Sequence, residues 1–160
     1  MTTDERRERM EFLIRRYFDG CNLADRGMML ECLAPEADHY FPDGSPFGVF
    51  RGAEAIACGW QECVERLDSR WTIDRMVVDT VANEAVIEWT HWKPLDGAHL
   101  RGAEWYRFAE DGLILEIRAY YACPTHAGVA AHDLGGFDYQ GRGYPTSPPE
   151  VAGRPLPLRR

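Results

Sequence analysis

The stretch EWYRFAEDGLILEIRAYY, residues 104–121, decides how the rest of the chain is interpreted. Two blocks of apolar and aromatic residues are separated by Glu-Asp-Gly at 110–112, a turn signal that predicts a β-hairpin. Further β-rich segments precede this hairpin. The expected strands are 70–80, 84–93, 100–109 and 113–122. Short turns join all four, so we predict an antiparallel meander.

The N-terminal part of the chain predicts helices. Thr2 followed by Glu5 has the form of a capping box, and apolar residues then recur at helical spacing. The expected elements are a first helix over about 3–19, a short helix between Asp25 and Pro35, a strand over 37–42 and a third helix over about 53–67. Three helices packed against one curved antiparallel sheet give an α+β fold.

The composition excludes several classes of partner. A net charge of −8 opposes general binding of nucleic acid, which needs a basic face. No apolar run reaches membrane length, and the N-terminal sequence MTTDERRERM is too charged for a secretory signal. We therefore expect a cytoplasmic protein that binds neither nucleic acid nor membranes.

Cysteine and histidine spacing gives no sign of a metal or a cofactor. The five cysteines form no C-x-x-C pair, so we expect reduced thiols that serve as packing residues. The five histidines show none of the usual zinc-binding patterns. No glycine-rich phosphate loop follows a predicted strand. We expect no metal site and no cofactor.

The order of these elements, together with the pattern of residues 104–121, resembles the NTF2-like superfamily, which includes SnoaL-like proteins, ketosteroid isomerases and scytalone dehydratases. The resemblance covers about residues 5–122. It implies a curved sheet that wraps around a helix and leaves an apolar cone. It is specific for the fold and weak for function, because the superfamily holds many kinds of enzyme as well as binding modules.

Comparison with the enzymes of that superfamily finds some of their catalytic residues in this sequence and others replaced. Tyr17 and Glu104 match the places of the oxyanion-hole tyrosine and aspartic acid of ketosteroid isomerases, whereas Phe41 stands where those enzymes carry the general base. The His–Asp dyad of the dehydratase branch falls on Arg70 and Asn22. The epoxide hydrolase pattern falls on Trp89 and His91, so its triad is absent as well. The resemblance therefore implies a retained cone with a different catalytic set.

Strand alternation gives a second, independent route to the site. Residues 104, 106 and 108 share one strand face, and the aromatic members make that face apolar, which places Glu104 inside the cone. If Asp96-Gly97 closes a two-residue hairpin, position 89 lies opposite 104 and His91 is diagonal to Glu104. His39 points the same way as Phe41.

These placements define the candidate site. The candidate catalytic residues are Tyr17, His39, Arg70, His91 and Glu104, and the candidate substrate-binding residues are Asn22, Phe41, Trp60, Trp89, Tyr106 and Tyr121. A histidine, His91 or His39, is the favoured base, while Glu104 orients it or donates a proton as a neutral acid. Tyr17 and Arg70 would hold developing negative charge. Alternatively, Glu104 forms an ion pair with Arg70 or Arg101. His91 is then a core histidine or faces the solvent, and His39, near a loop, has no catalytic role.

Two functions are consistent with this set of residues. The first is a cofactor-independent acid–base enzyme, a lyase (dehydratase) or isomerase that includes retro-aldol-type C–C cleavage among its options. Its substrate would be small and apolar, either aromatic or polycyclic. The alternative is a non-catalytic module of the same fold that binds a small molecule or mediates assembly.

The composition changes past residue 123. Residues 1–123 are expected to form the domain, and residues 124–160, rich in glycine and proline, a C-terminal arm. Aromatic residues at 137, 139 and 144 are expected to pack this arm on the mouth of the cone or on a neighbouring subunit. An open sheet and such an arm together predict a homo-oligomer, a dimer or a trimer.

Overall fold

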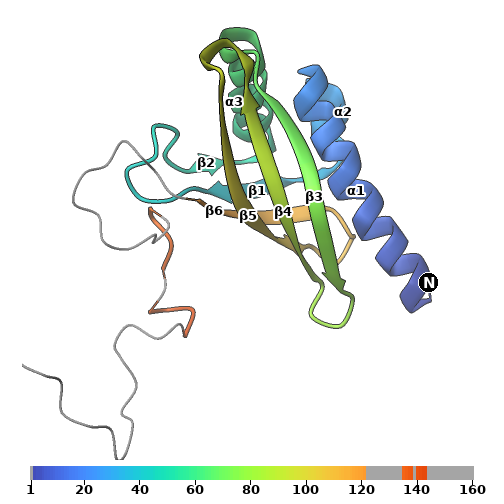
Figure 1. Cartoon of the computed structure of the whole chain (residues 1–160). Coiled ribbons are helices and arrows are strands. Elements are labelled where there is room, and N and C mark those ends of the chain that lie inside the picture. The colour runs from blue at the N-terminus through green and yellow to red at the C-terminus, as the bar shows by residue number, and fades with distance from the viewer. Residues whose placement is uncertain (1, 122–134, 139, 144–160) are drawn as a thin grey trace, which may run out of the picture.

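A computed structural model describes residues 2–121, 135–138 and 140–143, in which helices cover one face of a curved sheet (Figure 1). The helices are α1 (Thr3–Leu23), α2 (Arg26–Leu30) and α3 (Ala53–Leu67). The strands are β1 (Leu33–Tyr40), β2 (Phe50–Arg51), β3 (Arg70–Asp79), β4 (Glu84–Lys93), β5 (Ala98–Phe108) and β6 (Ile114–Tyr120). The predicted α+β class, the three helices and the four-strand meander are confirmed.

The sheet has the strand order β2-β1-β6-β5-β4-β3 and does not close. Four of its five pairings are antiparallel, but β1 pairs with β6 in parallel. The expectation of an antiparallel sheet throughout was therefore wrong at this pairing. The parallel pairing is possible because α3 and three strands of the meander separate β1 from β6 along the chain, so no hairpin joins the two strands.

Two helix boundaries differ from those expected from the sequence. Helix α1 continues through Gly20 to Leu23. A Cβ atom at Gly20 would lie 2.9 Å from Met29 Cγ, so the missing side chain lets α2 pack closely against α1. The predicted capping box of Thr2 and Glu5 is present. Helix α2 ends at Leu30 rather than near Pro35, which lies inside β1 where the register with β6 shifts.

The β4–β5 hairpin has a longer loop than the two residues predicted. Residues 94–97 form the turn, with a 3₁₀ segment at Pro94–Asp96, and Gly97 adopts a φ of 61° that favours glycine. His91 consequently pairs with Leu100, and Glu104 pairs with Ile87. The predicted register, with position 89 opposite 104, was wrong by two residues. Each side chain keeps its predicted face because the shift is an even number.

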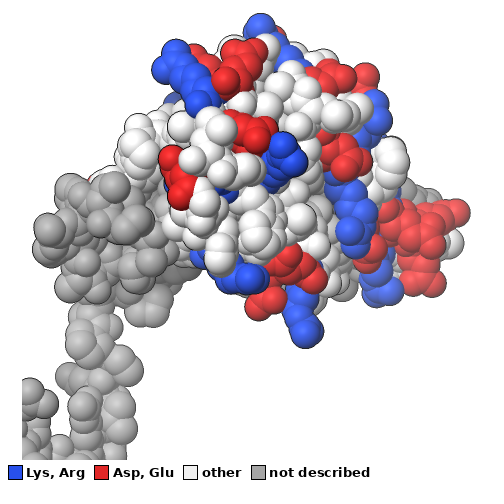
Figure 2. All heavy atoms as spheres, turned by 45° about the horizontal axis from the view of Figure 1, so that its top comes forward, with Lys and Arg blue, Asp and Glu red and all other residues white. Residues whose placement is uncertain are grey.

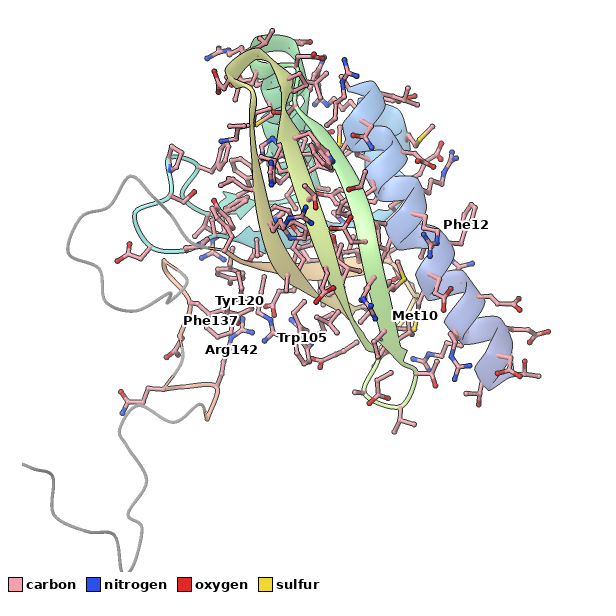
Figure 3. The ribbon with its side chains drawn as sticks, in the orientation of Figure 1. Met10, Phe12, Trp105, Tyr120, Phe137 and Arg142 are labelled. Carbon is pink, nitrogen blue, oxygen red and sulfur yellow. The ribbon has the colours of Figure 1, made fainter. Side chains whose placement is uncertain are left out.

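The core lies between the helices and the concave face of the sheet. Met10 points from α1 toward the sheet and is 2% exposed, whereas Phe12 points away and is 59% exposed (Figure 3). The largest fully buried side chains come from all layers: Tyr17, Ile14, Ile56, Ile87, Tyr106 and Ile117. This arrangement directs alternate residues of β4, β5 and β6 into one shared interior.

Charged side chains of both signs are interspersed on the face that Figure 2 draws, and they form no continuous basic area there. Many of these charges pair locally, for example Arg26 with Glu54 and Arg16 with Glu31. Among the described residues, no helix combines the length and the apolar character needed to cross a membrane.

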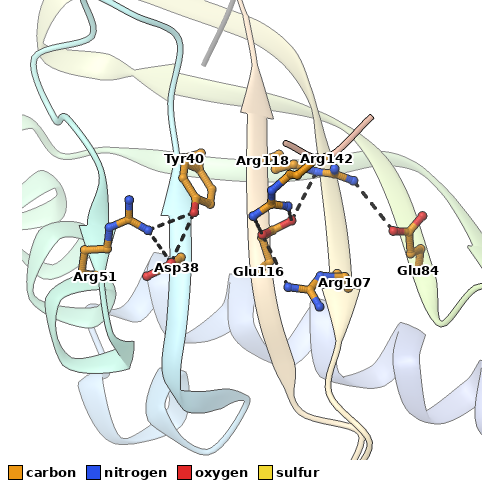
Figure 4. Close-up of polar contacts among 8 residues, drawn as sticks. All are labelled: Asp38, Tyr40, Arg51, Glu84, Arg107, Glu116, Arg118 and Arg142. Carbon is orange, nitrogen blue, oxygen red and sulfur yellow. Dashed lines mark hydrogen bonds and ion pairs between the residues drawn. The ribbon is translucent and has the colours of Figure 1, made fainter. Parts of the chain in front are cut away.

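Part of the C-terminal arm lies on the outer face of the sheet. The Phe137 ring packs edge-on against Tyr40 at 5.3 Å. Arg142 forms two hydrogen bonds to Glu116, of 3.1 and 2.8 Å; both residues are drawn in Figure 4. Tyr40 and Glu116 point away from the core, because their neighbours His39 and Ile117 point into it. The predictions for Tyr139 and Tyr144, and for most of the arm, lie outside the described residues.

Close packing at Gly102 gives a stability prediction. A Cβ atom there would lie 2.6 Å from Trp89 Cζ2 and 2.7 Å from the Tyr120 carbonyl oxygen, so Gly102→Ala should lower the free energy of unfolding by about 1–3 kcal/mol through overpacking. Chemical denaturation measures this. Gly27→Ala is the control, since its Cβ would meet nothing closer than 3.4 Å. Equal stability of the Gly102 variant and the native protein would contradict the packing described for Trp89.

Candidate functional site

A cavity of about 170 Å³ lies between the concave face of the sheet, α3 and the loop that follows β1. Its walls are mainly aromatic: Phe41, Phe47, Trp60, Trp71, Trp89 and Tyr121. The groups in the lining that can ionise near neutral pH or carry charge are Glu104, His91 and Lys93. Such an apolar space with few polar groups is typical of small-molecule sites.

Glu104 is the buried carboxyl group of this cavity, 6% exposed on the concave face of β5. The Tyr106 hydroxyl, two residues along the same face, donates a hydrogen bond of 2.5 Å to its Oε2 atom. The other oxygen, Oε1, lies 3.7 Å from His39 Nε2. The expected alternative, an ion pair with Arg70 or Arg101, is not found: Arg70 pairs with Asp68, and Arg101 with Asp74.

The surroundings of Glu104 raise its pKa to about 7. Burial is the dominant cause, because the ionised form loses its hydration. The hydrogen bond from Tyr106 acts in the opposite direction and lowers the pKa, but it is the smaller effect. A carboxyl group in this state exchanges its proton near neutral pH, as a general acid or base must.

His39 lies directly beside Glu104 and is 0% exposed. Its ring stacks on Phe41 at 4.2 Å and tilts against Trp60 at 5.3 Å, so both strand residues point inward as predicted. Burial lowers the pKa of His39 to about 3. Neither ring nitrogen has a hydrogen-bond partner among the described residues. The imidazole is therefore neutral over the physiological range.

Trp60 lines the cavity, and Tyr17 lies behind Trp60, in contact with a smaller recess. The Trp60 indole donates a hydrogen bond of 2.6 Å to the Tyr17 hydroxyl. A narrow recess beneath them is lined by both rings and by Glu104, Cys21, Phe18 and Trp71. Burial raises the pKa of Tyr17 well above its ordinary value, so the hydroxyl stays protonated. The structure thus brings Tyr17 into the same hollow as Glu104.

His91 occupies a different part of the cavity from the one predicted. It lies four residues along β4 from Ile87, the partner of Glu104, which is about 13 Å at 3.3 Å per residue. Its Nε2 atom forms a hydrogen bond of 2.8 Å with Ser69 Oγ, and its ring stacks on Trp71 at 4.7 Å. Burial, and secondarily the positive charge of Lys93, lowers the pKa of His91 to about 4.

Two other predicted site residues lie outside the cavity. The side chain of Arg70 is 65% exposed and binds Asp68, because the first residue of β3 points outward. Asn22 forms two hydrogen bonds with the backbone of Trp71, accepting from its N–H at 2.7 Å and donating to its carbonyl at 2.9 Å. Asn22 therefore attaches α1 to the start of β3 and has a structural role.

The residues predicted to contact substrate divide into two groups. Phe41, Trp60, Trp89 and Tyr121 line the cavity. Tyr106 does not, because it is fully buried behind Glu104.

Sequence reasoning missed several lining residues. Trp71 and Leu100 share strand faces with residues of the cavity, so correct register and alternation would have found both. Phe47 lies in the loop after β1, where no periodic signal exists.

Metal and thiol chemistry has little structural basis in the described part of the chain. Residues 2–121, 135–138 and 140–143 contain no group of three or more side chains able to hold a metal ion. Cys21, Cys32 and Cys63 are buried free thiols and Cys58 is an exposed one, while Cys123 is outside the described residues.

A family comparison assigns the chain. The model of the SnoaL-like domain matches residues 14–117. The protein belongs to the SnoaL-like family. This membership confirms the NTF2-like superfamily expected from the sequence. The matched range contains all five candidate catalytic residues predicted from the sequence, from Tyr17 to Glu104.

Solved structures resemble this SnoaL-like protein at different levels. A protein of unknown function with a cystatin-like fold from Methylobium petroleophilum PM1 is 52% identical, with a TM-score of 0.85 over 91% of this chain and 96% of that one. A candidate ketosteroid isomerase from Kribbella flavida is 19% identical, with a TM-score of 0.62 over 74% and 82%.

A candidate polyketide cyclase from Sinorhizobium meliloti is also 19% identical, with a TM-score of 0.56 over 67% of this chain and 92% of that one. Likeness at this level of identity shows the fold alone. No curated protein sequence matches the chain significantly.

The raised pKa of Glu104 makes the stability of the SnoaL-like domain depend on pH. Between pH 4.5 and about 7 the folded protein holds a proton on Glu104 that the unfolded chain has released. Stability from the protonated carboxyl is therefore present below pH 4.5 and is lost as pH rises to 7. Glu104→Gln removes this dependence. Relative to the native protein, it should gain up to about 3 kcal/mol between pH 4.5 and pH 8.

Urea denaturation of both proteins at the two pH values measures the effect. The histidines are present in both proteins, so their own titration cancels in the difference. A difference that stays constant with pH would mean that Glu104 keeps an ordinary pKa.

Proposed function

We propose that this SnoaL-like protein is a cofactor-independent enzyme in which Glu104 moves a proton to and from carbon on a small, apolar, single-ring substrate. The observation that carries the proposal is a carboxyl group with a pKa of about 7, buried in an aromatic cavity. A group whose pKa matches the working pH is the most effective acid–base catalyst. Clefts with a group perturbed in this way are candidates for active sites.

Glu104, rather than a histidine, is the proposed base. The pKa values of His39 and His91 are lowered to about 3 and about 4, so their neutral rings are weak bases. The carboxylate of Glu104, whose pKa is about 7, binds a proton more strongly than either ring. His91 is also far from the inner end of the cavity, and its Nε2 atom is engaged with Ser69.

The neighbours of Glu104 suit one catalytic group that takes a proton and later returns it. Tyr106 holds one carboxyl oxygen and leaves Oε1 as the atom that can accept the proton. Trp89 lines the cavity from the same face of the sheet, and its partner on β5 is Gly102, two residues before Glu104. Its buried indole N–H has no hydrogen-bond partner among the described residues.

Proton transfer of this kind favours isomerisation over elimination. In isomerisation, Glu104 removes a proton from one carbon next to a carbonyl and returns it to another carbon, so atoms balance without a second acid. Elimination needs another group to protonate the leaving group, and the pKa values of Tyr17 and Tyr106 are both raised well above the ordinary value. The candidate ketosteroid isomerase among the structural neighbours shares the fold, and its printed name is consistent with this class of reaction.

The size of the cavity limits the substrate. About 170 Å³ is close to the roughly 150 Å³ of an engineered cavity that binds benzene. One aromatic or aliphatic ring with a few further atoms fills such a space. We therefore propose a single-ring substrate in place of a polycyclic one.

The proposal is tested by proton exchange, which needs no knowledge of the product. Exchange of the α-protons of phenylacetone in D₂O, followed by ¹H NMR, reports proton abstraction directly. Glu104→Gln should slow the enzyme-catalysed exchange by about 10²–10⁴-fold, the usual range for loss of a general base. The rate of the native protein should rise with pH and level off above about 7, as Glu104 ionises.

Glu88→Gln is the matched control, because Glu88 is an exposed carboxylate on β4 that pairs with Arg75. It should retain the native rate. A fully active Glu104→Gln variant would contradict the proposal. Tight binding of single-ring ketones without exchange would instead favour the binding-module alternative.

A further inference from the structure

Lys93 is the only lysine in the chain and the last residue of β4. It is half-buried and lines the cavity together with His91 and Leu100. It forms no ion pair with any carboxylate of the described residues, although the chain contains 26 acidic residues. A cation that borders an apolar cavity without a protein partner is available for a ligand anion.

Several arginines elsewhere in the described chain behave differently. Arg16, Arg26 and Arg51 each bind a carboxylate on a neighbouring element. Arg70, which precedes the cavity residue Trp71, forms an ion pair with Asp68. Local pairing is thus common among the described residues. Arg6, Arg9 and Arg15 also form no ion pair there, but they do not line the cavity, whereas Lys93 does.

Strand register places Lys93 and Glu104 at opposite ends of one inward-facing row. Lys93 pairs with Ala98, which is six residues before Glu104 on β5, a backbone separation of about 20 Å. Both side chains reach into the space between. The aromatic rings of Trp71 and Trp89 lie along this row.

We propose that the substrate is a single-ring compound that carries a carboxylate, and that Lys93 binds this carboxylate while the ring lies between the tryptophans. This inference deepens the proposed function and rests on it for the identity of the reacting end. The two end groups together orient the ligand. Ionised Glu104 repels an anion from the inner end, and Lys93 attracts it to the outer end.

The charge of the whole protein makes a specific cation necessary. With a net charge of −8, the protein as a whole repels anions at long range. The neighbouring His91 contributes no positive charge, because its pKa is lowered to about 4. An anionic substrate therefore depends on Lys93 for attraction at this end of the cavity.

The test compares acids with their neutral amides. Isothermal titration calorimetry at pH 8 measures binding of benzoate, phenylacetate and 3-phenylpropanoate and of the three corresponding amides to the full chain. The native protein should bind at least one acid about tenfold more tightly than its amide, the effect of one charged hydrogen bond. Lys93→Met should abolish this preference, and Lys93→Arg should retain it.

Arg15→Gln is the matched control for net charge, because Arg15 is exposed on α1. It should leave the preference unchanged, and melting temperatures check that all variants are folded. Equal affinity for acid and amide in the native protein, an unchanged preference in Lys93→Met, or no binding of any acid at millimolar concentration would overturn the inference.

The binding test of Lys93 and the exchange test of Glu104 can fail separately. If Glu104→Gln proves fully active in proton exchange but Lys93→Met loses the preference for acids, the anion site stands and the proposed base is wrong. If Glu104→Gln is inactive but acids show no dependence on Lys93, the proposed reaction stands and the substrate class is wrong.

Discussion

The burial of one carboxyl group, that of Glu104, is the constraint on which the site depends. Ionisation of this group in an apolar cone is unfavourable, and the single hydrogen bond from Tyr106 compensates only in part. Because Glu104 and Tyr106 are two residues apart on β5, the strand itself fixes their relative position. Helices α1 and α3 then cover the pair through Tyr17 and Trp60, which are hydrogen-bonded to each other.

A second glutamate shows that burial alone does not set this chemistry. Glu116, on the adjacent strand β6, is also buried but points to the outer face of the sheet. Burial would raise its pKa, but the hydrogen bond from Arg142 and the charges of Arg107 and Arg118 outweigh this and lower it (Figure 4). The two faces of one sheet therefore hold an ionised glutamate among arginines and a proton-exchanging glutamate among aromatic rings. The difference is that no charged arginine or lysine among the described residues forms an ion pair with Glu104.

Sequence reasoning found the fold and the central residue because both follow from local patterns. Alternation along β5 was enough to place Glu104 on the concave face, and strand alternation placed His39 beside Phe41. The hairpin loop could not be counted from Asp96-Gly97 alone, because Pro94 starts a 3₁₀ turn that lengthens it. That error brought His91 close to Glu104 in the prediction, whereas His39 is the histidine whose Nε2 atom lies 3.7 Å from Glu104 Oε1.

Long-range contacts account for the other differences between the predicted site and the observed one. Nothing in the local sequence indicates that Asn22 binds the backbone of Trp71, 49 residues away. The direction of Arg70 depends on how β3 leaves α3, where Asp68 ends the helix in the left-handed conformation with a φ of 51°. The role of Lys93 also required the observed register, since only then do Lys93 and Glu104 line one cavity from opposite ends.

The central claim is that Glu104 exchanges its proton near neutral pH, and the most direct measurement is its own titration. ¹³C NMR of side-chain carboxyl carbons, with the Glu104 signal assigned by its loss in Glu104→Gln, gives the midpoint in the folded protein. The account predicts a midpoint near pH 7, well separated from those of exposed glutamates close to about 4.3. A midpoint below pH 5 would contradict it, because Glu104 would then be a permanently ionised carboxylate and a weak base.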